Sequence, residues 1–158
     1  MTTMADRLTF LKGFLQRPRE VGSVVPSSRF LEQRLRRVID AAHARTLVEL
    51  GPGTGGTTRA VLKALPADAR LLAIDTNPAF VRELAAIRDP RLHVAEGSAA
   101  DLATLIRQHG LTAPDIVFSG IPFSTLPEAV AGGILESVWA ALAPGGRFTA
   151  YPFRDSAC

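Results

Sequence analysis

The chain has 158 residues, a formal net charge of +3 and one cysteine, Cys158. This length predicts a single domain with its own core, and a lone cysteine excludes an internal disulfide framework. No apolar run approaches the ~20 residues of a membrane-spanning helix, and the N-terminus lacks the pattern of a secretory signal. We therefore expect a domain of the reducing cytoplasm.

The charge is unevenly distributed along this domain. Residues 1–45 carry nine Lys or Arg and four Asp or Glu, a net charge of +5, whereas residues 46–158 sum to −2. Apolar residues recur at helical spacing in Thr3–Arg17 and predict an amphipathic helix, which either packs on the domain or lies in a membrane interface. The basic charge indicates phospholipid or nucleic acid as partner, or else a solvated helix face. We divide the single domain 1–158 into an N-terminal helical segment, 1–45, and an α/β core, 46–158.

The most informative stretch is Leu47–Gly56, with the sequence LVELGPGTGG. Its apolar start predicts a buried strand, and the helix expected over Thr57–Leu65 completes a unit of strand, glycine loop and helix. A loop with so few side chains lets a ligand approach the backbone, with amide N–H groups directed at it. Glu49 lies inside the apolar run and needs a partner, which an ammonium group on a ligand would supply.

A second signal is Leu71–Asp75, LLAID, which predicts a strand ending in a carboxylate 20 positions after Gly55. An acidic residue at that place suits the hydroxyl groups of a ribose. The glycine spacing is G-x-G-x-G rather than the G-x-G-x-x-G of dinucleotide folds, and no Gly-Lys-Ser/Thr follows. The two signals together indicate a site for a nucleoside whose binding does not depend on phosphate groups.

Val48–Gly55 and Ala73–Asp75 resemble the first two motifs of the S-adenosylmethionine (SAM)-dependent methyltransferases with a Rossmann-like sheet. The resemblance implies an α/β fold with a doubly wound, mostly parallel sheet, helices on both faces, and SAM as cofactor. The competing interpretation is a glycine turn in another kind of α/β protein. By resemblance, the cofactor-binding residues are Glu49, Gly51, Gly53, Gly55, Asp75, Thr76, Gly97, Ser98, Ala99, Ser119 and Ser27, with Asp101 as a weaker candidate.

The remaining pattern alternates strands and helices. Asn77 is placed to cap a helix that begins at Pro78, Gly110 to end the next helix, and Ser124 to cap a later one that Gly132–Gly133 breaks. Further strands are expected at Arg91–Ala95, Asp115–Ser119 and Arg147–Phe153. In the family, the loop after the third strand covers the adenine, which is the basis for assigning residues 97–99.

The fourth expected strand runs into Ser119–Phe123, SGIPF. This form is similar to the fourth motif of bacterial phospholipid N-methyltransferases and, less closely, to that of rRNA adenine dimethyltransferases. Ser119 and Tyr151 are polar residues expected near the carboxyl ends of strands, where ligand sites are usually found in α/β folds. They are therefore the candidate catalytic residues for deprotonating the substrate amine. Phe123 is expected to hold a partly methylated ammonium by cation–π attraction.

The run FLKGFLQRPREVGSVVPSS, residues 10–28, resembles the N-terminal signature of the bacterial phospholipid N-methyltransferases. The resemblance implies a lid over the SAM pocket that includes Ser27, and the headgroup of phosphatidylethanolamine as substrate. The protein would then be peripheral on the inner face of the cytoplasmic membrane. The alternatives are an RNA or rRNA adenine N-methyltransferase and a non-catalytic SAM-binding module.

Two further expectations concern metals and assembly. The three histidines are not spaced as metal ligands, and we predict no metal. Relatives normally add two more strands, which nothing after Asp155 supplies, so the fifth strand is expected to be an open edge. A truncation, a homodimer that covers the edge, or a natural minimal domain would each explain this.

Overall fold

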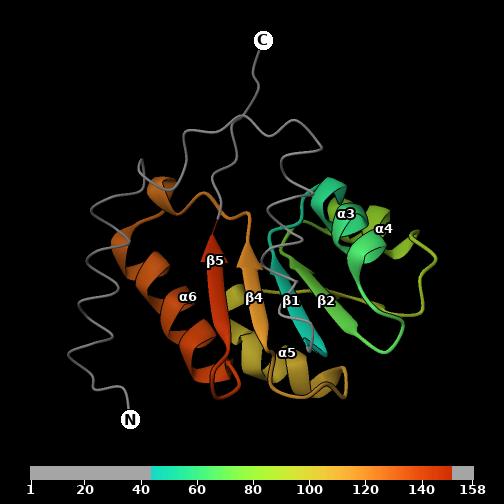
Figure 1. Cartoon of the computed structure of the whole chain (residues 1–158). Helices are drawn as coiled ribbons and strands as arrows, with labels where there is room; N and C mark the ends of the chain where they lie inside the picture. Colours follow the sequence, from blue (N-terminus) through green and yellow to red (C-terminus); the bar gives the residue numbers. More distant parts are fainter. Residues whose placement is uncertain (1–43, 151–158) are drawn as a thin grey trace.

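The computed structural model describes residues 44–150, which form one parallel five-stranded sheet with helices on both faces (Figure 1). The strand order is β3-β2-β1-β4-β5, and every neighbouring pair is parallel. The elements are β1 (Thr46–Leu50), α3 (Gly56–Ala64), β2 (Arg70–Asp75), α4 (Pro78–Ala85), β3 (Leu92–Glu96), η1 (Ala99–Asp101), α5 (Leu102–Gln108), β4 (Ile116–Ser119), η2 (Phe123–Thr125), α6 (Glu128–Ala141) and β5 (Arg147–Ala150). This confirms the predicted Rossmann-like α/β fold. The predicted helices of residues 1–43 lie outside the described residues.

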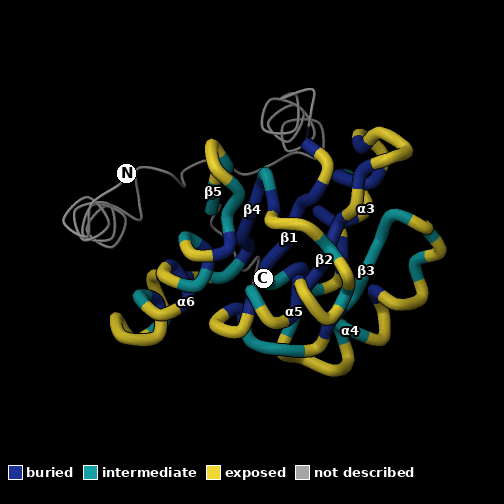
Figure 2. Tube along the Cα trace, turned by 90° about the horizontal axis from the view of Figure 1, so that it is seen from below, coloured by how far each residue is buried: buried dark blue, intermediate teal, exposed yellow. Residues whose placement is uncertain are grey.

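The core consists of two apolar layers, one on each face of the sheet. Successive side chains of a strand point to opposite faces, so Leu47 packs in the layer with α3, while Val48 and Leu50 pack in the layer with α5 and α6. Figure 2 shows the central strands buried and the outer sides of the helices exposed. Burial on both faces explains why the strands are continuous apolar runs rather than alternating ones.

The chain reverses its direction across the sheet at β1. From β1 the chain passes to β2 and β3 on one side, and later to β4 and β5 on the other. The loops that follow β1 and β4 therefore separate at the carboxyl ends of two adjacent strands. In open α/β sheets, ligands bind at such a switch point.

Two of the predicted helix boundaries are confirmed. The Asn77 side chain accepts a hydrogen bond from the Ala79 amide at 2.9 Å, and Pro78 is the first residue of α4. Gly110 has a φ of +65°, a conformation that favours glycine, and follows the end of α5.

The predicted start of the helix after β4 is wrong. Ser124 lies within η2 and caps nothing, since α6 begins only after Pro127. The residue before a proline is disfavoured in the helical region, and Leu126 is extended, with a ψ of 149°. Gly132 and Gly133 do not break α6, because the buried face of this helix supplies more stability than the about 1 kcal/mol that each glycine removes.

β5 lies at one end of the sheet and pairs with β4, and no second partner for it exists among residues 44–150. The predicted extension to Phe153 falls outside the described residues. A homodimer through this edge stays a prediction.

Candidate functional site

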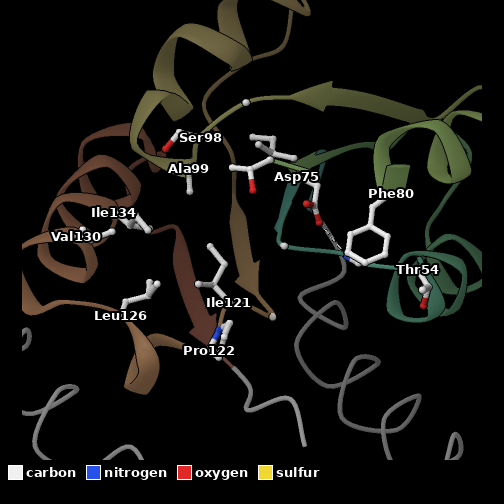
Figure 3. Close-up of a pocket in the computed structure, with 16 residues that line it drawn as sticks. Thr54, Asp75, Phe80, Ser98, Ala99, Ile121, Pro122, Leu126, Val130 and Ile134 are labelled. Carbon is white, nitrogen blue, oxygen red and sulfur yellow. Dashed lines mark hydrogen bonds between the residues drawn. The ribbon is translucent and has the colours of Figure 1, made fainter. Parts of the chain in front are cut away.

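A cavity of about 590 Å³ lies at the carboxyl ends of the strands (Figure 3). It spans the switch point, because the loops after β1, β2, β3 and β4 all contribute to its wall. The lining residues are Gly51, Gly53, Thr54, Ile74, Asp75, Thr76, Phe80, Gly97, Ser98, Ala99, Gly120, Ile121, Pro122, Leu126, Val130 and Ile134.

The glycine loop after β1 needs glycine for two separate reasons. Gly51, Gly53 and Gly55 have φ values of +66°, +56° and +88°, which other residues rarely adopt. In addition, a Cβ at Gly51 would lie 2.9 Å from Cγ1 of Ile121 in the loop after β4. The glycine loop therefore presents backbone without side chains to the cavity, and it contacts the loop after β4.

Asp75 ends β2 and holds the glycine loop against the next turn. Its Oδ2 accepts a hydrogen bond from the Gly53 amide at 3.1 Å, and its Oδ1 accepts one from the Asn77 amide at 2.9 Å. A carboxylate has about four lone-pair sites, so each oxygen retains capacity for one more donor. The carboxylate of Asp75 is thus positioned to accept hydrogen bonds from two adjacent hydroxyl groups.

The loop after β3 forms a third wall. The Gly97 amide donates to the Asp75 carbonyl at 3.0 Å, and the Ser98 side chain accepts from the Ala100 amide at 3.1 Å. A Cβ at Gly97 would lie 3.0 Å from Cδ1 of Leu105, so the backbone passes close to α5. This wall offers small side chains and suits a flat, weakly polar group.

The side of the cavity away from Asp75 is apolar, and it adjoins the loop after β3, because α6 packs against η1. Ile121 and Pro122 follow β4, Leu126 follows η2, and Val130 and Ile134 lie on α6. We call these five residues the apolar lip. Among residues 44–150, Asp75 is the single charged side chain that lines the cavity. The site therefore has one polar end and one apolar end.

Residues 48–148 match the family model described as a methyltransferase domain. The chain belongs to this family. It is a SAM-dependent methyltransferase, as the glycine loop after β1 and the carboxylate at the end of β2 indicated. The cavity fits this cofactor, because a bare backbone loop and a carboxylate with spare lone pairs face one side of it.

Two curated relatives of this methyltransferase differ in how much of their length it matches. It is 33% identical over 147 residues to an ornithine lipid N-methyltransferase of Singulisphaera acidiphila, covering 92% of this chain and 77% of that protein. It is 33% identical over 114 residues to ribosomal RNA small subunit methyltransferase A of Rhizobium johnstonii, covering 69% of this chain and 39% of that protein.

Solved structures share the fold. The O-methyltransferase TomG from Streptomyces achromogenes, in complex with SAM, matches with a TM-score of 0.58 and 20% identity, over 95% of this chain and 66% of TomG. An O-methyltransferase from Bacillus cereus in complex with SAH matches with a TM-score of 0.59 and 18% identity, over 89% of this chain and 64% of that protein. These likenesses concern the arrangement of sheet and helices.

The structure brings most of the predicted cofactor residues of this methyltransferase to one cavity. Those that line it are Gly51, Gly53, Asp75, Thr76, Gly97, Ser98 and Ala99. Gly55 is buried beside the cavity, where a Cβ would lie 2.9 Å from Cδ2 of Leu84. Asp101, the weaker candidate, is exposed in η1 and does not line the cavity. Ser27 lies outside the described residues.

Glu49 does not line the cavity, and its carboxylate has a protein partner. Strand alternation directs the side chain to the α3 face of the sheet, where it is fully buried. There Oε2 accepts a hydrogen bond from the Thr58 hydroxyl at 2.6 Å. A threonine of α3 therefore supplies one partner for this carboxylate, and the assignment of Glu49 to the cofactor stays a prediction.

Two predicted catalytic residues, Ser119 at the end of β4 and Phe123 in η2, do not line the cavity. Ser119 is fully buried, and its Oγ accepts a hydrogen bond from the Ile121 amide at 3.1 Å. Phe123 is 6% exposed, packs edge-on against Phe148 at 6.4 Å between ring centroids, and belongs to the core. The ring thus packs in the core, and its expected contact with a substrate ammonium stays a prediction. Tyr151 lies outside the described residues.

Sequence reasoning missed several lining residues. Phe80 lies in the first turn of α4, five residues after Asp75, and faces the cavity in Figure 3. Val130 lies in the first turn of α6. Each lies in the first turn of an α-helix that follows a strand on the side of its carboxyl end, and this position is the signal that would have found them.

The groups with displaced pKa values are not on the cavity lining. The hydrogen bonds from Arg91 lower the pKa of Asp89 to about 2. Burial lowers the pKa of His93, with smaller contributions from the positive charges of His109 and Arg70. These groups act on the stability of the β3 side of the sheet rather than on the ligand.

Residues 44–150 contain no grouping of three His, Cys, Asp or Glu side chains that could hold a metal ion. Within the same range, no helix is both long enough and apolar enough to cross a membrane. A metal-free site stays a prediction.

Proposed function

We propose that this methyltransferase methylates the primary amine of a membrane-lipid headgroup. Phosphatidylethanolamine is the acceptor expected from the sequence, and a lipid with an ornithine headgroup presents the same amine chemistry. The observation that carries the proposal is the similarity to an ornithine lipid N-methyltransferase, which extends over 92% of this chain, against 69% for the rRNA methyltransferase A.

The polar end of the cavity would hold the cofactor. Asp75 would accept hydrogen bonds from the ribose hydroxyls, and the loop of residues 97–99 would cover the adenine. The backbone at Gly51 and Gly53 leaves room for the remaining part of the molecule. Bound SAM supplies a methyl group that its sulfonium already activates. The protein therefore has mainly to orient the acceptor and exclude water.

Ser119 would act as a positioning residue. Its buried hydroxyl holds the Ile121 amide at 3.1 Å and thereby fixes the start of the apolar lip. The acceptor nitrogen must be unprotonated to attack a methyl group. The cavity wall favours the neutral amine, because an apolar lining disfavours the charged form.

The described cavity wall offers no contact for the phosphates of an RNA acceptor. Proteins bind nucleic acid largely through Lys and Arg contacts to phosphates. Among residues 44–150, no Lys or Arg lines the cavity. The basic charge of residues 1–45 would instead bind an anionic membrane surface, and the protein would then be a peripheral enzyme on the cytoplasmic face.

The test is transfer of labelled methyl groups from SAM to three acceptors offered in parallel. These are vesicles containing phosphatidylethanolamine, vesicles containing an ornithine lipid, and undermodified ribosomal RNA. We expect label in one or both lipid extracts. Label in RNA alone would overturn the acceptor class, and SAM binding without label in any acceptor would favour a non-catalytic SAM-binding module.

A further inference from the structure

We infer that Thr58 is a positioning residue for cofactor binding, because it joins the strand before the glycine loop to the helix after it. The Thr58 hydroxyl donates a hydrogen bond to Oε2 of Glu49 at 2.6 Å. Neither side chain lines the cavity, so Thr58 would act on the cofactor through the shape of residues 51–55. The inference rests on the proposed placement of SAM at the polar end of the cavity and deepens it.

The hydrogen bond restrains the two ends of the glycine loop. Glu49 lies in β1 two residues before Gly51, and Thr58 lies in α3 three residues after Gly55. The pair therefore sets the distance between the end of the strand and the start of the helix. Glycine has more backbone freedom than any other residue, so a loop with three glycines at positive φ needs such a restraint to keep one shape.

Burial makes this restraint strong. Glu49 and Thr58 are both 0% exposed, so water does not compete for the hydrogen bond between them. A distance of 2.6 Å is typical of a hydroxyl that donates to a carboxylate, and such bonds are stronger than those between neutral groups. Loss of the hydroxyl would remove a donor from a buried carboxylate. We expect the structure to adjust where the backbone is freest, which is the adjoining glycine loop.

The neighbours of the pair show that packing alone does not require polar side chains here. Leu47 lies two residues before Glu49 on the same face of β1, and Val61 lies three residues after Thr58 on α3. Both are fully buried in the apolar layer between the sheet and α3. An apolar pair of similar volume would pack in this layer at least as well as a buried carboxylate does. The glycine loop is the functional element that the pair adjoins.

Other hydrogen bonds fasten the same loop to the neighbouring strand. The Gly51 amide donates to the Ile74 carbonyl of β2 at 3.0 Å. The Gly53 amide donates to Oδ2 of Asp75, at the end of β2, at 3.1 Å. Neither bond involves α3. The Thr58 hydroxyl adds the restraint on the helix side, because its bond joins β1 directly to α3.

The test compares Thr58→Val, which removes the hydroxyl and keeps the shape of the side chain, with Thr58→Ser, which keeps the hydroxyl. Thr57→Val makes the first exchange at the neighbouring buried residue, whose hydroxyl is not the donor to Glu49. Val61→Ala weakens the packing of α3 and leaves the hydrogen bond in place, so it controls for a loss of stability. Each substitution is made in the full chain, and calorimetry measures the Kd for SAM.

We expect Thr58→Val to raise the Kd for SAM about tenfold, and Thr58→Ser to keep the Kd of the unsubstituted protein. Thr57→Val and Val61→Ala should leave the Kd unchanged at a temperature at which urea unfolding shows every variant to be folded. An unchanged Kd for Thr58→Val, an equal rise in either control, or an equal rise in Thr58→Ser would overturn the inference.

Amide hydrogen exchange of the SAM-free protein tests the loop without a ligand. The Gly53 amide donates to Asp75, and the Gly55 amide donates to the Pro52 carbonyl at 3.1 Å. We expect both amides to exchange several times faster in Thr58→Val, relative to the amides of β2, and to keep their relative rates in Val61→Ala. Equal relative rates in the two variants would overturn the inference.

A second variant keeps the test valid if Thr58→Val does not fold. Thr58→Ala also removes the hydroxyl, and its smaller side chain leaves room for a water molecule to donate to the carboxylate. The same higher Kd and the same faster exchange of the loop amides are expected for it. A Kd and exchange rates equal to those of the unsubstituted protein would overturn the inference.

Failure of the proposed function has a different outcome. SAM binding requires no acceptor, so an absence of methyl transfer to lipid leaves the Kd and exchange measurements intact. The placement of SAM is tested by Asp75→Ala, since an unaltered Kd in that variant would overturn the placement and the inference with it. A higher Kd in Asp75→Ala with an unaltered Kd in Thr58→Val would overturn the role of Thr58 alone.

Discussion

The two ends of the cavity are built in different ways. At the polar end, backbone amides, glycines with positive φ and one carboxylate form the wall, and Asp75 ties two of the loops together. At the apolar end, the wall consists of side chains from a loop, a 3₁₀ turn and a helix. The polar end therefore depends on backbone geometry, whereas the apolar end depends on which side chains project.

This difference indicates how the two ends tolerate change. A backbone-built site accepts few substitutions, because a Cβ at Gly51 meets Ile121 and a positive φ is strained in other residues. A side-chain-built site can change its occupant by exchanging apolar residues with little effect on the fold. The polar end therefore suits a cofactor that is shared by a family.

The largest effect is expected for Asp75→Ala at the polar end. Hydrogen bonds to a charged group contribute about 1.5–3 kcal/mol, so the Kd for SAM should rise about 10- to 100-fold. Isothermal titration calorimetry measures this directly. Asp101→Ala removes an exposed carboxylate outside the cavity and should leave the Kd unchanged. An unaltered Kd for Asp75→Ala would show that SAM does not bind through the Asp75 carboxylate.

Gly51→Ala tests the place where the two ends touch. The substitution introduces about 1–2 kcal/mol of left-handed backbone strain, and its Cβ also lies within contact of Ile121. Gly145→Ala has a similar φ of +76° but open space around its Cβ, so it carries the strain alone. We expect both to lower the free energy of unfolding in urea, and Gly51→Ala alone to weaken SAM binding. Equal SAM affinities of the two variants would contradict a role in SAM binding for the contact between Gly51 and Ile121.

The pH dependence of stability should come from the β3 side. The pKa of His93 is below its usual value in the folded protein because of burial and the charges of His109 and Arg70. As the pH falls through about 6.5, the unfolded state takes up this proton first, so stability is complete above that pH and declines below it. Urea unfolding at pH 7.5 and 5.5 measures the decline.

Replacement of the second histidine supplies the control for this prediction. The rings of His93 and His109 meet edge-on at 5.8 Å. His109→Gln should reduce the decline, because it removes one of the repelling charges. A decline that is unaffected by both His93→Gln and His109→Gln would place the titrating group elsewhere.

The smallest effect is expected for Gly133→Ala in α6. Gly133 is exposed within the helix, and a Cβ there meets nothing within 4 Å. The substitution should raise the free energy of unfolding by about 0.5–1 kcal/mol. Because Gly133 does not line the cavity, KM for both substrates should be unchanged. A changed KM for the lipid would show that flexibility of α6 contributes to acceptor binding.

The polar end was predictable from the sequence, and the apolar end was not. Gly51 and Asp75 are constrained by backbone geometry at fixed spacing, which a linear pattern records. The orientation of Phe123 depends on a 3₁₀ turn, and the start of α6 depends on the extended residue before Pro127. Such local choices decide which side chains face the cavity, so Phe123 was expected at the site and Val130 was not.

The partner of Glu49 illustrates a signal that was present but not used. Strand alternation places Glu49 on the same face as Leu47, which packs in the layer with α3. Thr58, on that helix, is nine residues away in the sequence. This spacing could have predicted that a threonine of the next helix donates a hydrogen bond to the buried carboxylate.

The most direct test of the cofactor site is steady-state kinetics with SAM and the lipid acceptor both varied, for Asp75→Ala and for the exposed control Asp101→Ala. We predict that Asp75→Ala raises KM for SAM and leaves KM for the vesicle lipid unchanged, whereas Asp101→Ala changes neither KM. An unchanged KM for SAM in Asp75→Ala, or an equal rise in both variants, would contradict the assignment of the polar end to the cofactor.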